Sequence, residues 1–281
     1  MTTPRDPSLL SRASTRDNPL DVEVVTTSEG ALAILDRACG EVMHPVTGPL
    51  IEARAIYIER SRLLERLALP ETRPLVVLDV GLGGGTNALL AWQASEARAP
   101  GGRPLEIISF DRSWAAFDLA RAPEYAAAFG FENDGVAERL RSSNFVEGKS
   151  TSWRMVLGEL PDTLSAVPAA SADLAFWDMF SPRANPDLWN VSTFQALRAV
   201  CRSDVTVLTY SSATQIRSAL LLAGFFVGTD HAVETGRPTT LATLDLAHLD
   251  APLDARFLSR LERSSLPFPN DAPSDALERL R

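Results

Sequence analysis

The sequence has few of the residues that bind metals or cross-link secreted proteins. Its 281 residues include two cysteines, Cys39 and Cys201, and three histidines that lie far apart along the chain. Two cysteines without metal-ligand spacing argue against a disulfide framework and favour a reducing, cytoplasmic location. The scattered histidines argue against a zinc site. We therefore expect a protein without a bound metal.

Long apolar runs and an excess of basic residues are also missing. No stretch approaches the roughly 20 residues that a membrane-spanning helix needs, and residues 1–6 lack the apolar core of a signal peptide. Lysine and arginine total 27 against 36 acidic residues, which gives a formal net charge of −9. This charge argues against broad nucleic-acid binding, which needs a basic face, but is compatible with a local basic patch.

What the sequence does contain is one informative glycine-rich stretch. Six residues that are mostly branched and apolar, Leu75–Val80, run into a loop with four glycines, and a helical pattern follows. An apolar run closed by glycine is typical of a strand buried on both faces of a parallel sheet. Glycines allow a tight turn and a close ligand approach, and the amides of the next helical turn then point at that ligand.

The spacing of this loop indicates which ligand it binds. Gly81-x-Gly83-x-Gly85 differs from the GxGxxG of dinucleotide sites, whose third glycine comes one residue later. A G-x-G-x-G turn after an acidic strand residue is the pattern of S-adenosyl-L-methionine (SAM) methyltransferases. A glycine-rich turn also arises from packing alone, so the loop by itself leaves both interpretations open.

Acidic residues follow the ends of the next expected strands. Asp111 ends a strand over 105–111, Glu159 follows a strand over 153–157, and Asp178 ends a strand over 172–178. The carboxyl ends of parallel strands share one crevice, so we expect these acids to meet beside the glycine loop. Asp111 is placed to hold both ribose hydroxyls, or else it only caps the following helix; Glu159 is placed to accept from an adenine amino group.

The order of the expected elements predicts an α/β fold. Strands alternate with helices from residue 71 to 249, which implies a mostly parallel sheet of seven strands with helices on both faces. We expect residues 1–70 to form an arm, a hairpin and one helix over 50–67, packed on this domain. Residues 130–150 read as a polar connection with a short helix, and residues 250–281 as a helical tail.

One segment is specific enough to indicate a family. Asp-x-x-Phe-x-Asp-x-Phe-Ser-Pro-x-x-Asn-Pro-x-x-Trp, over residues 173–189, resembles the methyltransferase domain of the bifunctional enzyme that completes 5-methylaminomethyl-2-thiouridine at the tRNA wobble position. The loop Gly81–Asn87 is similar to the cofactor loop of that family. The segment 41–49 is similar to the entry of its stand-alone members, which lack the FAD-dependent oxidase half.

The resemblance implies a Rossmann-like class I methyltransferase that transfers a methyl group from SAM to the aminomethyl group of the wobble uridine in tRNA. Asp178 would hold the amine and act in catalysis. The residues implied at the cofactor are Gly81, Leu82, Gly83, Gly85, Asn87, Asp111, Glu159 and Asp178, and those implied at the substrate are Phe180, Pro182, Asn185, Trp189 and Arg237.

Several alternatives stay open at this point. Trp177, Phe180 and Trp189 are also suited to a hydrophobic core, and His44 is read as a structural histidine. The enzyme can equally methylate a small-molecule or protein amine on the same fold. A catalytically silent SAM-fold binding module is the third interpretation, against which the acids at all expected strand ends argue.

Overall fold

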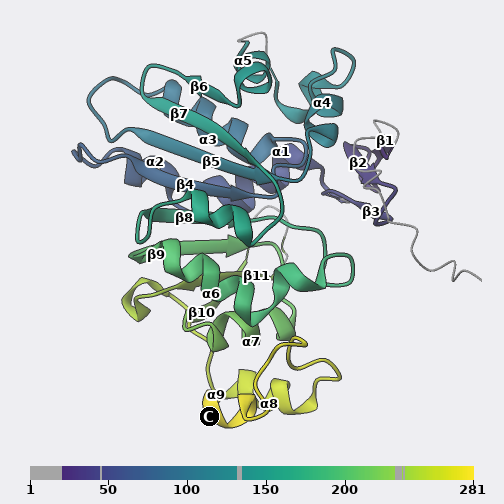
Figure 1. Cartoon of the computed structure of the whole chain (residues 1–281), viewed down its shortest axis with the longest axis vertical. Coiled ribbons are helices and arrows are strands. Elements are labelled where there is room, and N and C mark those ends of the chain that lie inside the picture. The colour runs from purple at the N-terminus through teal and green to yellow at the C-terminus, as the bar shows by residue number, and fades with distance from the viewer. Residues whose placement is uncertain (1–20, 45, 132–134, 232–235, 237) are drawn as a thin grey trace, which may run out of the picture.

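One mixed sheet of eight strands forms the centre of the molecule (Figure 1). The computed structural model describes residues 21–44, 46–131, 135–231, 236 and 238–281. The strands are β4 (Leu75–Val80), β5 (Leu105–Asp111), β6 (Phe145–Glu147), β7 (Thr151–Leu157), β8 (Ala172–Trp177), β9 (Cys201–Thr209), β10 (Phe226–His231) and β11 (Pro238–Thr243). Their order across the sheet is β10-β11-β9-β8-β4-β5-β7-β6. The five strands from β9 to β7 are parallel, whereas β11, β10 and β6 pair antiparallel.

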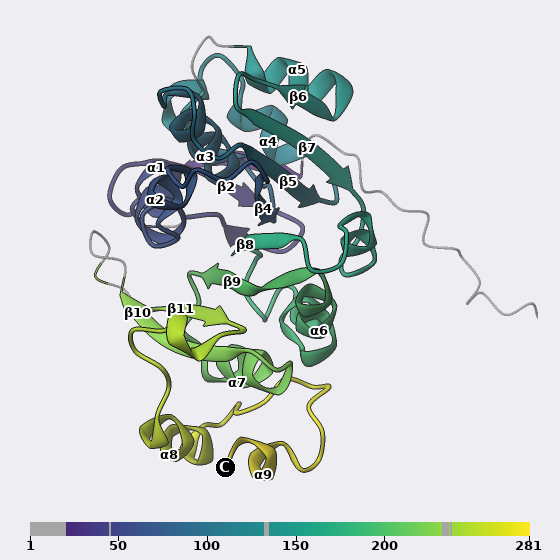
Figure 2. The same ribbon diagram turned by 90° about the vertical axis from the view of Figure 1, so that its left-hand side faces the viewer.

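The central strand β4 is buried on both faces, as its apolar run predicted. All six of its residues are buried, with Leu75 and Val77 in one core cluster and Val76, Leu78 and Val80 in the other. Helix α3 (Thr86–Glu96) covers the first face, and α6 (Val191–Val200) and α7 (Thr214–Leu222) cover the second (Figure 2). Such two-sided burial is the reason for the continuous apolar pattern of a parallel strand.

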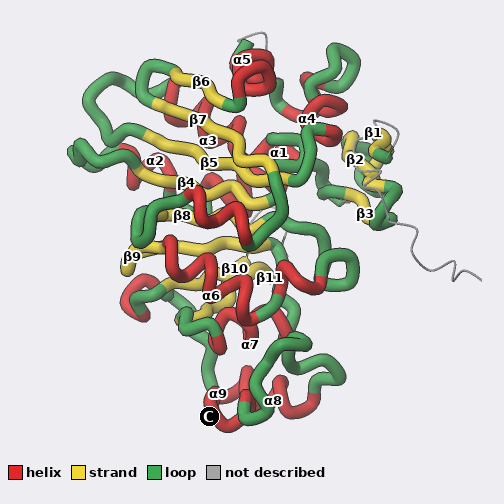
Figure 3. Tube along the Cα trace, in the orientation of Figure 1, coloured by secondary structure: helices red, strands yellow, loops and turns green. Residues whose placement is uncertain are grey.

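Helices also connect the strands and extend the chain beyond the sheet (Figure 3). They are α4 (Ala115–Ala120), α5 (Val136–Ser143), α8 (Ala255–Arg263) and α9 (Ala276–Leu280), with short 3-10 turns η2 (Ala126–Phe129), η3 (Asp162–Ala166), η4 (Pro186–Trp189) and η5 (Leu246–His248). The segment between α8 and α9 is fastened to the second face. Asp271 accepts from the N–H groups of Val191 (2.9 Å) and Ser192 (2.8 Å), which caps the start of α6.

The N-terminal unit lies beside the main sheet. It contains β1 (Val22–Thr26), β2 (Leu32–Asp36) and β3 (Glu41–Val42), which form a separate antiparallel sheet, followed by α1 (Pro49–Glu52), the π-helix η1 (Ala53–Ile58) and α2 (Leu63–Leu67). The expected hairpin is confirmed. The expected single helix over 50–67 is wrong, because the chain turns at residues 59–62 and Arg62 has a left-handed φ of 53°.

Two further expectations need correction. The sheet has eight strands instead of seven, because β6 adds an antiparallel edge strand to β7. The connection over 130–150 therefore contains β6 as well as the short helix α5, while residues 132–134 lie outside the described part. A three-residue edge strand gives almost no periodic signal. The proposed domain boundaries after residues 70 and 249 stay predictions. Among the described residues, none of the helices is long and apolar enough to cross a membrane.

Candidate functional site

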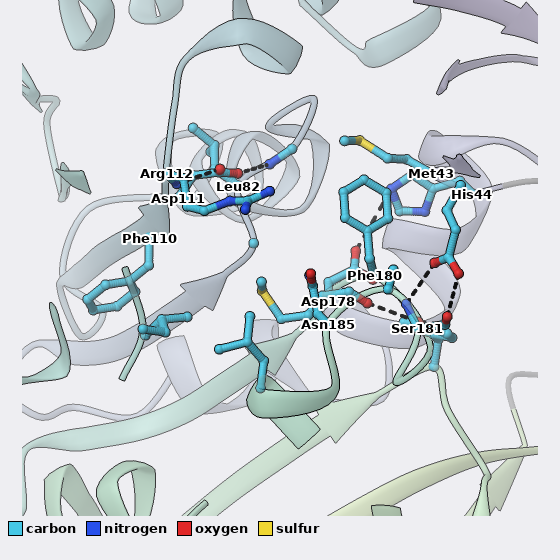
Figure 4. Close-up of a pocket in the computed structure, with 18 of the residues that line it drawn as sticks. Met43, His44, Leu82, Phe110, Asp111, Arg112, Asp178, Phe180, Ser181 and Asn185 are labelled. Atoms are coloured by element: carbon cyan, nitrogen blue, oxygen red, sulfur yellow. Dashed lines mark hydrogen bonds and ion pairs between the residues drawn. The ribbon is translucent and has the colours of Figure 1, made fainter. Parts of the chain in front are cut away.

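A cavity of about 670 Å³ opens at the carboxyl ends of the parallel strands. Its walls come from the glycine loop after β4, the ends of β5 and β7, the loop after β8, and Tyr210 after β9. The N-terminal unit closes the remaining side with Gly40 to His44 and Glu52. This volume lies in the range of about 300–1,000 Å³ that is usual for small-molecule sites. The cavity is therefore the candidate active site, and Figure 4 shows its lining.

The glycine loop takes a path that side chains would obstruct. Gly81 has a φ of 90°, and a Cβ there would lie 2.6 Å from the carbonyl oxygen of Asp178. Gly85 has a φ of 84° and precedes α3, and its Cβ would lie 2.7 Å from the ring of Phe117. Gly81, Leu82 and Gly83 line the cavity, as expected of cofactor-binding residues. Gly85 is not among the lining residues and instead packs against the core.

Asp111 stands at the end of β5 with its carboxylate held by backbone groups. It accepts hydrogen bonds from the N–H groups of Gly83 (2.9 Å) and Arg112 (2.7 Å). Burial raises the pKa of this carboxyl, and the backbone N–H donors oppose that effect. Asp111 lines the cavity, and its contact with the ribose hydroxyls stays a prediction. The bond to Gly83 couples the acid to the glycine loop, so each fixes the other.

Glu159 and Asn87 also line the cavity. Glu159 is exposed and follows Gly158 beyond the end of β7, so the adenine contact stays a prediction. Asn87 is buried in the first turn of α3, where its Nδ2 donates to Asp178 Oδ2 over 2.7 Å. The Oδ1 atom of Asn87 is buried and has no hydrogen-bond partner. An acceptor left unpaired in this way suits a donor supplied by a ligand.

Asp178 follows β8 directly and is held in place by the sheet. Its N–H donates to Val80 O (2.9 Å), so backbone pairing with β4 continues as far as this residue. Its side chain is 13% exposed and lies near the cavity centre, between Asp111 on one side and His44 on the other in Figure 4. The strand-end position expected from the sequence is therefore confirmed, whereas the catalytic role stays a prediction.

His44 and Glu52 face Asp178 from the N-terminal unit. The Nδ1 atom of His44 lies 3.2 Å from Glu52 Oε2, and its Nε2 atom lies 3.8 Å from Asp178 Oδ2. Burial lowers the pKa of His44, but the hydrogen bond to Glu52 and the negative charges of Asp178 and Glu52 outweigh it, so the net effect is a raised pKa. The sequence predicted a structural role for His44, but this residue lines the cavity.

The loop after Asp178 is fixed on both sides. The Trp189 indole N–H donates to Phe180 O (2.6 Å), and the Tyr210 hydroxyl donates to Met179 O (2.9 Å). From the N-terminal side, Glu41 on β3 accepts from the backbone N–H of Ser181 (2.9 Å) and from its hydroxyl. These contacts give a loop with two prolines a defined shape.

The predicted substrate residues separate into two groups. Phe180 and Asn185 line the cavity, in keeping with substrate contact. Trp189 is 0% exposed and packs edge-on against Phe194 and Tyr210, so it supports the loop from beneath. Pro182 is not among the lining residues, and Arg237 lies outside the described residues.

Sequence reasoning missed most of the residues that the N-terminal unit brings to the site. Glu41, Glu52 and Met43 line the cavity, and Tyr57 on η1 places its buried hydroxyl near Asp178. A usable signal was the Glu41–Pro45 segment, whose acid and histidine precede a turn. Within the described ranges, no group of three or more His, Cys, Asp or Glu side chains is arranged to hold a metal ion.

Comparison with known proteins identifies the activity class. Residues 133–245 match the family model described as S-adenosyl-L-methionine-dependent methyltransferase. The chain is an S-adenosyl-L-methionine-dependent methyltransferase. The residues at the cavity fit this cofactor, because the side-chain-free glycine loop, the carboxylate of Asp111 and the unpaired Oδ1 of Asn87 supply room, an acceptor for hydroxyls and an acceptor for an N–H donor.

The methyltransferase has relatives among curated proteins and solved structures. It is 34% identical over 203 residues to the "tRNA 5-methylaminomethyl-2-thiouridine biosynthesis bifunctional protein MnmC" of Pseudomonas aeruginosa, covering 68% of this chain and 30% of that protein. The Chromobacterium violaceum protein of the same name is 30% identical over 199 residues, covering 67% and 30%. The crystal structure of MnmC2 from Aquifex aeolicus matches with a TM-score of 0.71 and 26% identity, over 92% of this chain and 82% of that one.

These relatives confirm the resemblance expected from the 173–189 segment. They also confirm the Rossmann-like class I fold, since the solved MnmC2 structure covers nearly the whole chain. The chain spans about 30% of the length of the curated relatives it matches.

Proposed function

We propose that this methyltransferase N-methylates the 5-aminomethyl group of the wobble uridine in tRNA, in the cytoplasm. The observation that carries the proposal is the placement of Asp178 at the centre of the cavity, opposite His44 and bonded to Asn87. A carboxylate there suits an amine that arrives protonated. The printed names of the curated relatives support tRNA as the molecule that bears the amine.

The residues that would hold SAM lie on the sheet side of the cavity. The Gly81–Gly83 turn would accommodate the amino-acid part, Asp111 the ribose hydroxyls and Glu159 the adenine amino group. When bound, SAM supplies a methyl group that is already electrophilic because its sulfur carries a positive charge. The protein then needs to align the acceptor nitrogen with that methyl and to keep the nitrogen unprotonated.

The residues that would hold the modified uridine lie on the side of the 178–189 loop. Phe180 lines the cavity and offers an aromatic face for a planar base, and Asn185 offers amide donors and acceptors for its edge. Arg112 and Arg183 also line the cavity and are exposed, and Arg183 is 81% exposed beyond its contact with Glu41. These two arginines are the described candidates for the local basic patch that phosphates require on an acidic protein.

Methyl transfer from labelled SAM tests the proposal. The acceptors are tRNA with 5-aminomethyl-2-thiouridine at the wobble position, the same tRNA with unmodified uridine, and small primary amines. We expect label only in the aminomethyl tRNA, in a nucleoside one methylene heavier. Binding should weaken as salt rises, with a shallow slope because few phosphates are contacted.

The same assay separates the remaining alternatives. Turnover of a small amine or a protein amine without turnover of the tRNA would establish the first alternative. SAM binding without transfer to any acceptor would establish the silent binding module, which the methyltransferase family match already disfavours.

A further inference from the structure

The N-terminal unit places a histidine next to Asp178 and a glutamate on the far side of that histidine. His44 lies after β3, Glu52 ends α1, and both line the cavity that contains Asp178. Their side chains are 15% and 12% exposed, so each is largely removed from solvent. Glu52 lies against one ring nitrogen of His44 at 3.2 Å, which leaves the other, Nε2, directed at Asp178 across 3.8 Å.

A primary alkyl amine is mostly protonated near neutral pH and has no lone pair to offer in that state. Methyl transfer to it therefore requires that one proton leaves the nitrogen first. A carboxylate attracts the ammonium group but is a weak base for it. A neutral imidazole is a stronger base, and histidine is the side chain that ordinarily exchanges protons in this pH range.

We propose that Nε2 of His44 receives the proton of the substrate ammonium and that Glu52 orients the ring for this transfer. The proposal rests on the proposed amine substrate. The Oδ2 atom of Asp178 lies 3.8 Å from Nε2 of His44, so an ammonium group bound by Asp178 on that side would lie beside the imidazole. Glu52 accepts the Nδ1–H of His44, which selects the tautomer whose Nε2 lone pair faces the cavity.

The step balances in charge and atoms. The ammonium N–H bond breaks, the proton binds to Nε2, and the imidazolium lies between the carboxylates of Glu52 and Asp178. The neutral nitrogen then forms its bond to the methyl as the methyl–sulfur bond breaks, and the product leaves as a secondary ammonium. His44 returns its proton to solvent through the cavity that it lines.

The groups around His44 determine how it titrates. Glu52 on α1 and Asp178 after β8 are the acids that raise its pKa against the effect of burial. Glu41 on β3, Tyr57 on η1 and Tyr210 after β9 surround the same carboxylates, and burial raises the pKa of both tyrosines above their ordinary range. The tyrosines therefore stay neutral, and the base form of His44 is gained as pH rises through its raised pKa.

The pH dependence of kcat/KM on aminomethyl tRNA tests this role. The variants are His44→Asn, chosen because His44 has a φ of 54° and asparagine tolerates this region, and Glu52→Gln. His248→Asn is the matched control, on a side chain that is 46% exposed in η5. The wild-type rate should fall toward acid pH as His44 becomes protonated.

We expect three results. His44→Asn should lower kcat about 10²-fold at neutral pH and abolish this acid limb. Glu52→Gln keeps an acceptor for Nδ1–H but removes the charge, so its acid limb should move to lower pH. His248→Asn should reproduce the wild-type profile. The shift in Glu52→Gln distinguishes proton transfer from a purely structural role, which would lower the rate equally at every pH.

Calorimetric SAM binding in each variant confirms that the site is intact, and proton NMR titration of the His44 imidazole in the wild type and in Glu52→Gln follows its protonation directly. An acid limb unchanged in both variants, with methyl transfer still occurring, would overturn the role of His44 and leave the proposed substrate standing. A wild-type enzyme that methylates no aminomethyl tRNA at any pH would overturn the proposed substrate and this role with it.

Discussion

Two aspartates at opposite ends of β8 differ in what surrounds them. Asp173 is 2% exposed and accepts from both Arg73 (2.6 and 2.8 Å) and Arg103 (3.0 Å), as well as from the N–H of Val76. Asp178 is 13% exposed and has no arginine partner among the described residues; its side chain contacts Asn87 and His44, and Tyr57 lies nearby. The arginines lower the pKa of Asp173 against the effect of burial. One strand thus has an arginine-paired carboxylate at one end, and at the other it leads into a carboxylate that lines the cavity.

This difference shows how the surroundings of the same residue type suit it to stability in one place and leave it accessible to a ligand in another. A buried carboxylate saturated by guanidinium groups has no remaining capacity for a ligand and holds its neighbours together. A carboxylate beside a cavity, held by one amide and facing an imidazole, keeps an oxygen for a substrate. Two further aspartates on neighbouring strands also differ in their surroundings. Asp111 on β5 is held by backbone N–H groups, whereas Asp79 on β4 is fully buried and accepts from the hydroxyl of Ser109.

The first prediction concerns Asp178, at the cavity end of β8. Asp178→Asn keeps the shape and the contact with Asn87 but removes the charge that holds the ammonium group. The methyl-transfer rate should fall by roughly 10²–10⁴, the usual contribution of a positioned acid–base group. SAM affinity should change little, since Asp178 belongs to the acceptor step. Steady-state kinetics with calorimetry checks both; a defect explained by lost SAM binding would contradict this assignment.

The second prediction concerns Asp173, at the arginine-paired end of β8. Asp173→Asn removes the buried charge partner of Arg103, whose side chain is 5% exposed, and leaves it, among the described residues, only the more exposed carboxylate of Glu71 at 3.4 Å. The free energy of unfolding should fall by about 3–5 kcal/mol, as when one partner of a buried ion pair is removed. Chemical denaturation measures this loss. Glu262→Gln breaks the exposed pair with Arg281 and should cost roughly 0–1 kcal/mol. Equal losses of unfolding free energy in Asp173→Asn and Glu262→Gln would contradict the stabilising role of the buried pair at Asp173.

The third prediction concerns Asp79, which is buried on β4 and takes up a proton more readily than an exposed aspartate. Burial raises its pKa to about 7, with Asp178 and Asp111 adding to the effect and Ser109 opposing it. The folded state binds the proton more tightly than the unfolded state, so this group lowers stability as pH rises from roughly 4 to about 7.

Asp79→Asn should remove this pH-dependent loss, which is at most about 4 kcal/mol for a pKa displaced by roughly three. The measurement is the difference in unfolding free energy between the two proteins at several pH values. A difference that stays constant from acid to neutral pH would show that Asp79 titrates normally.

The fourth prediction concerns the cofactor side. Asp111→Ala removes the acceptor expected for the ribose hydroxyls. SAM affinity should fall roughly 10- to 100-fold, because losing a charge-assisted hydrogen bond costs about 1.5–3 kcal/mol. Asp111→Asn separates the charge from the contact with Gly83 and should lose less. Unchanged SAM binding in Asp111→Ala, measured by calorimetry, would make the ribose assignment wrong.

The cofactor side could be predicted from the sequence because one rule places it. Parallel strands end at the same edge, so Asp111, Glu159 and Asp178 needed only the correct strand ends to be brought together beside the glycine loop. All three line the cavity. No such rule places the residues on the acceptor side of the cavity. His44 and Glu52 reach Asp178 from an extension more than 120 residues earlier in the chain, and no periodic pattern in the sequence indicates that contact.

Aromatic residues show a second limit of sequence reasoning. Phe180 and Trp189 lie in the same loop, and their residue types alone do not tell a stacking surface from a support. Phe180 lines the cavity. Trp189 is fully buried, and its indole N–H donates a hydrogen bond to the carbonyl oxygen of Phe180. That distinction depends on the path of the loop. The path is set by contacts with Glu41 and Tyr210 from distant parts of the chain.

The most direct test of the central claim, that Asp178 acts on the acceptor amine, is a pH series of single-turnover rates. Aminomethyl tRNA is mixed with saturating SAM and excess enzyme, wild type or Asp178→Asn. We expect the defect of the variant to shrink as pH rises, because more of the amine is then already deprotonated and the missing charge matters less. A variant as fast as the wild type, or a defect of the same size at every pH, would contradict the claim.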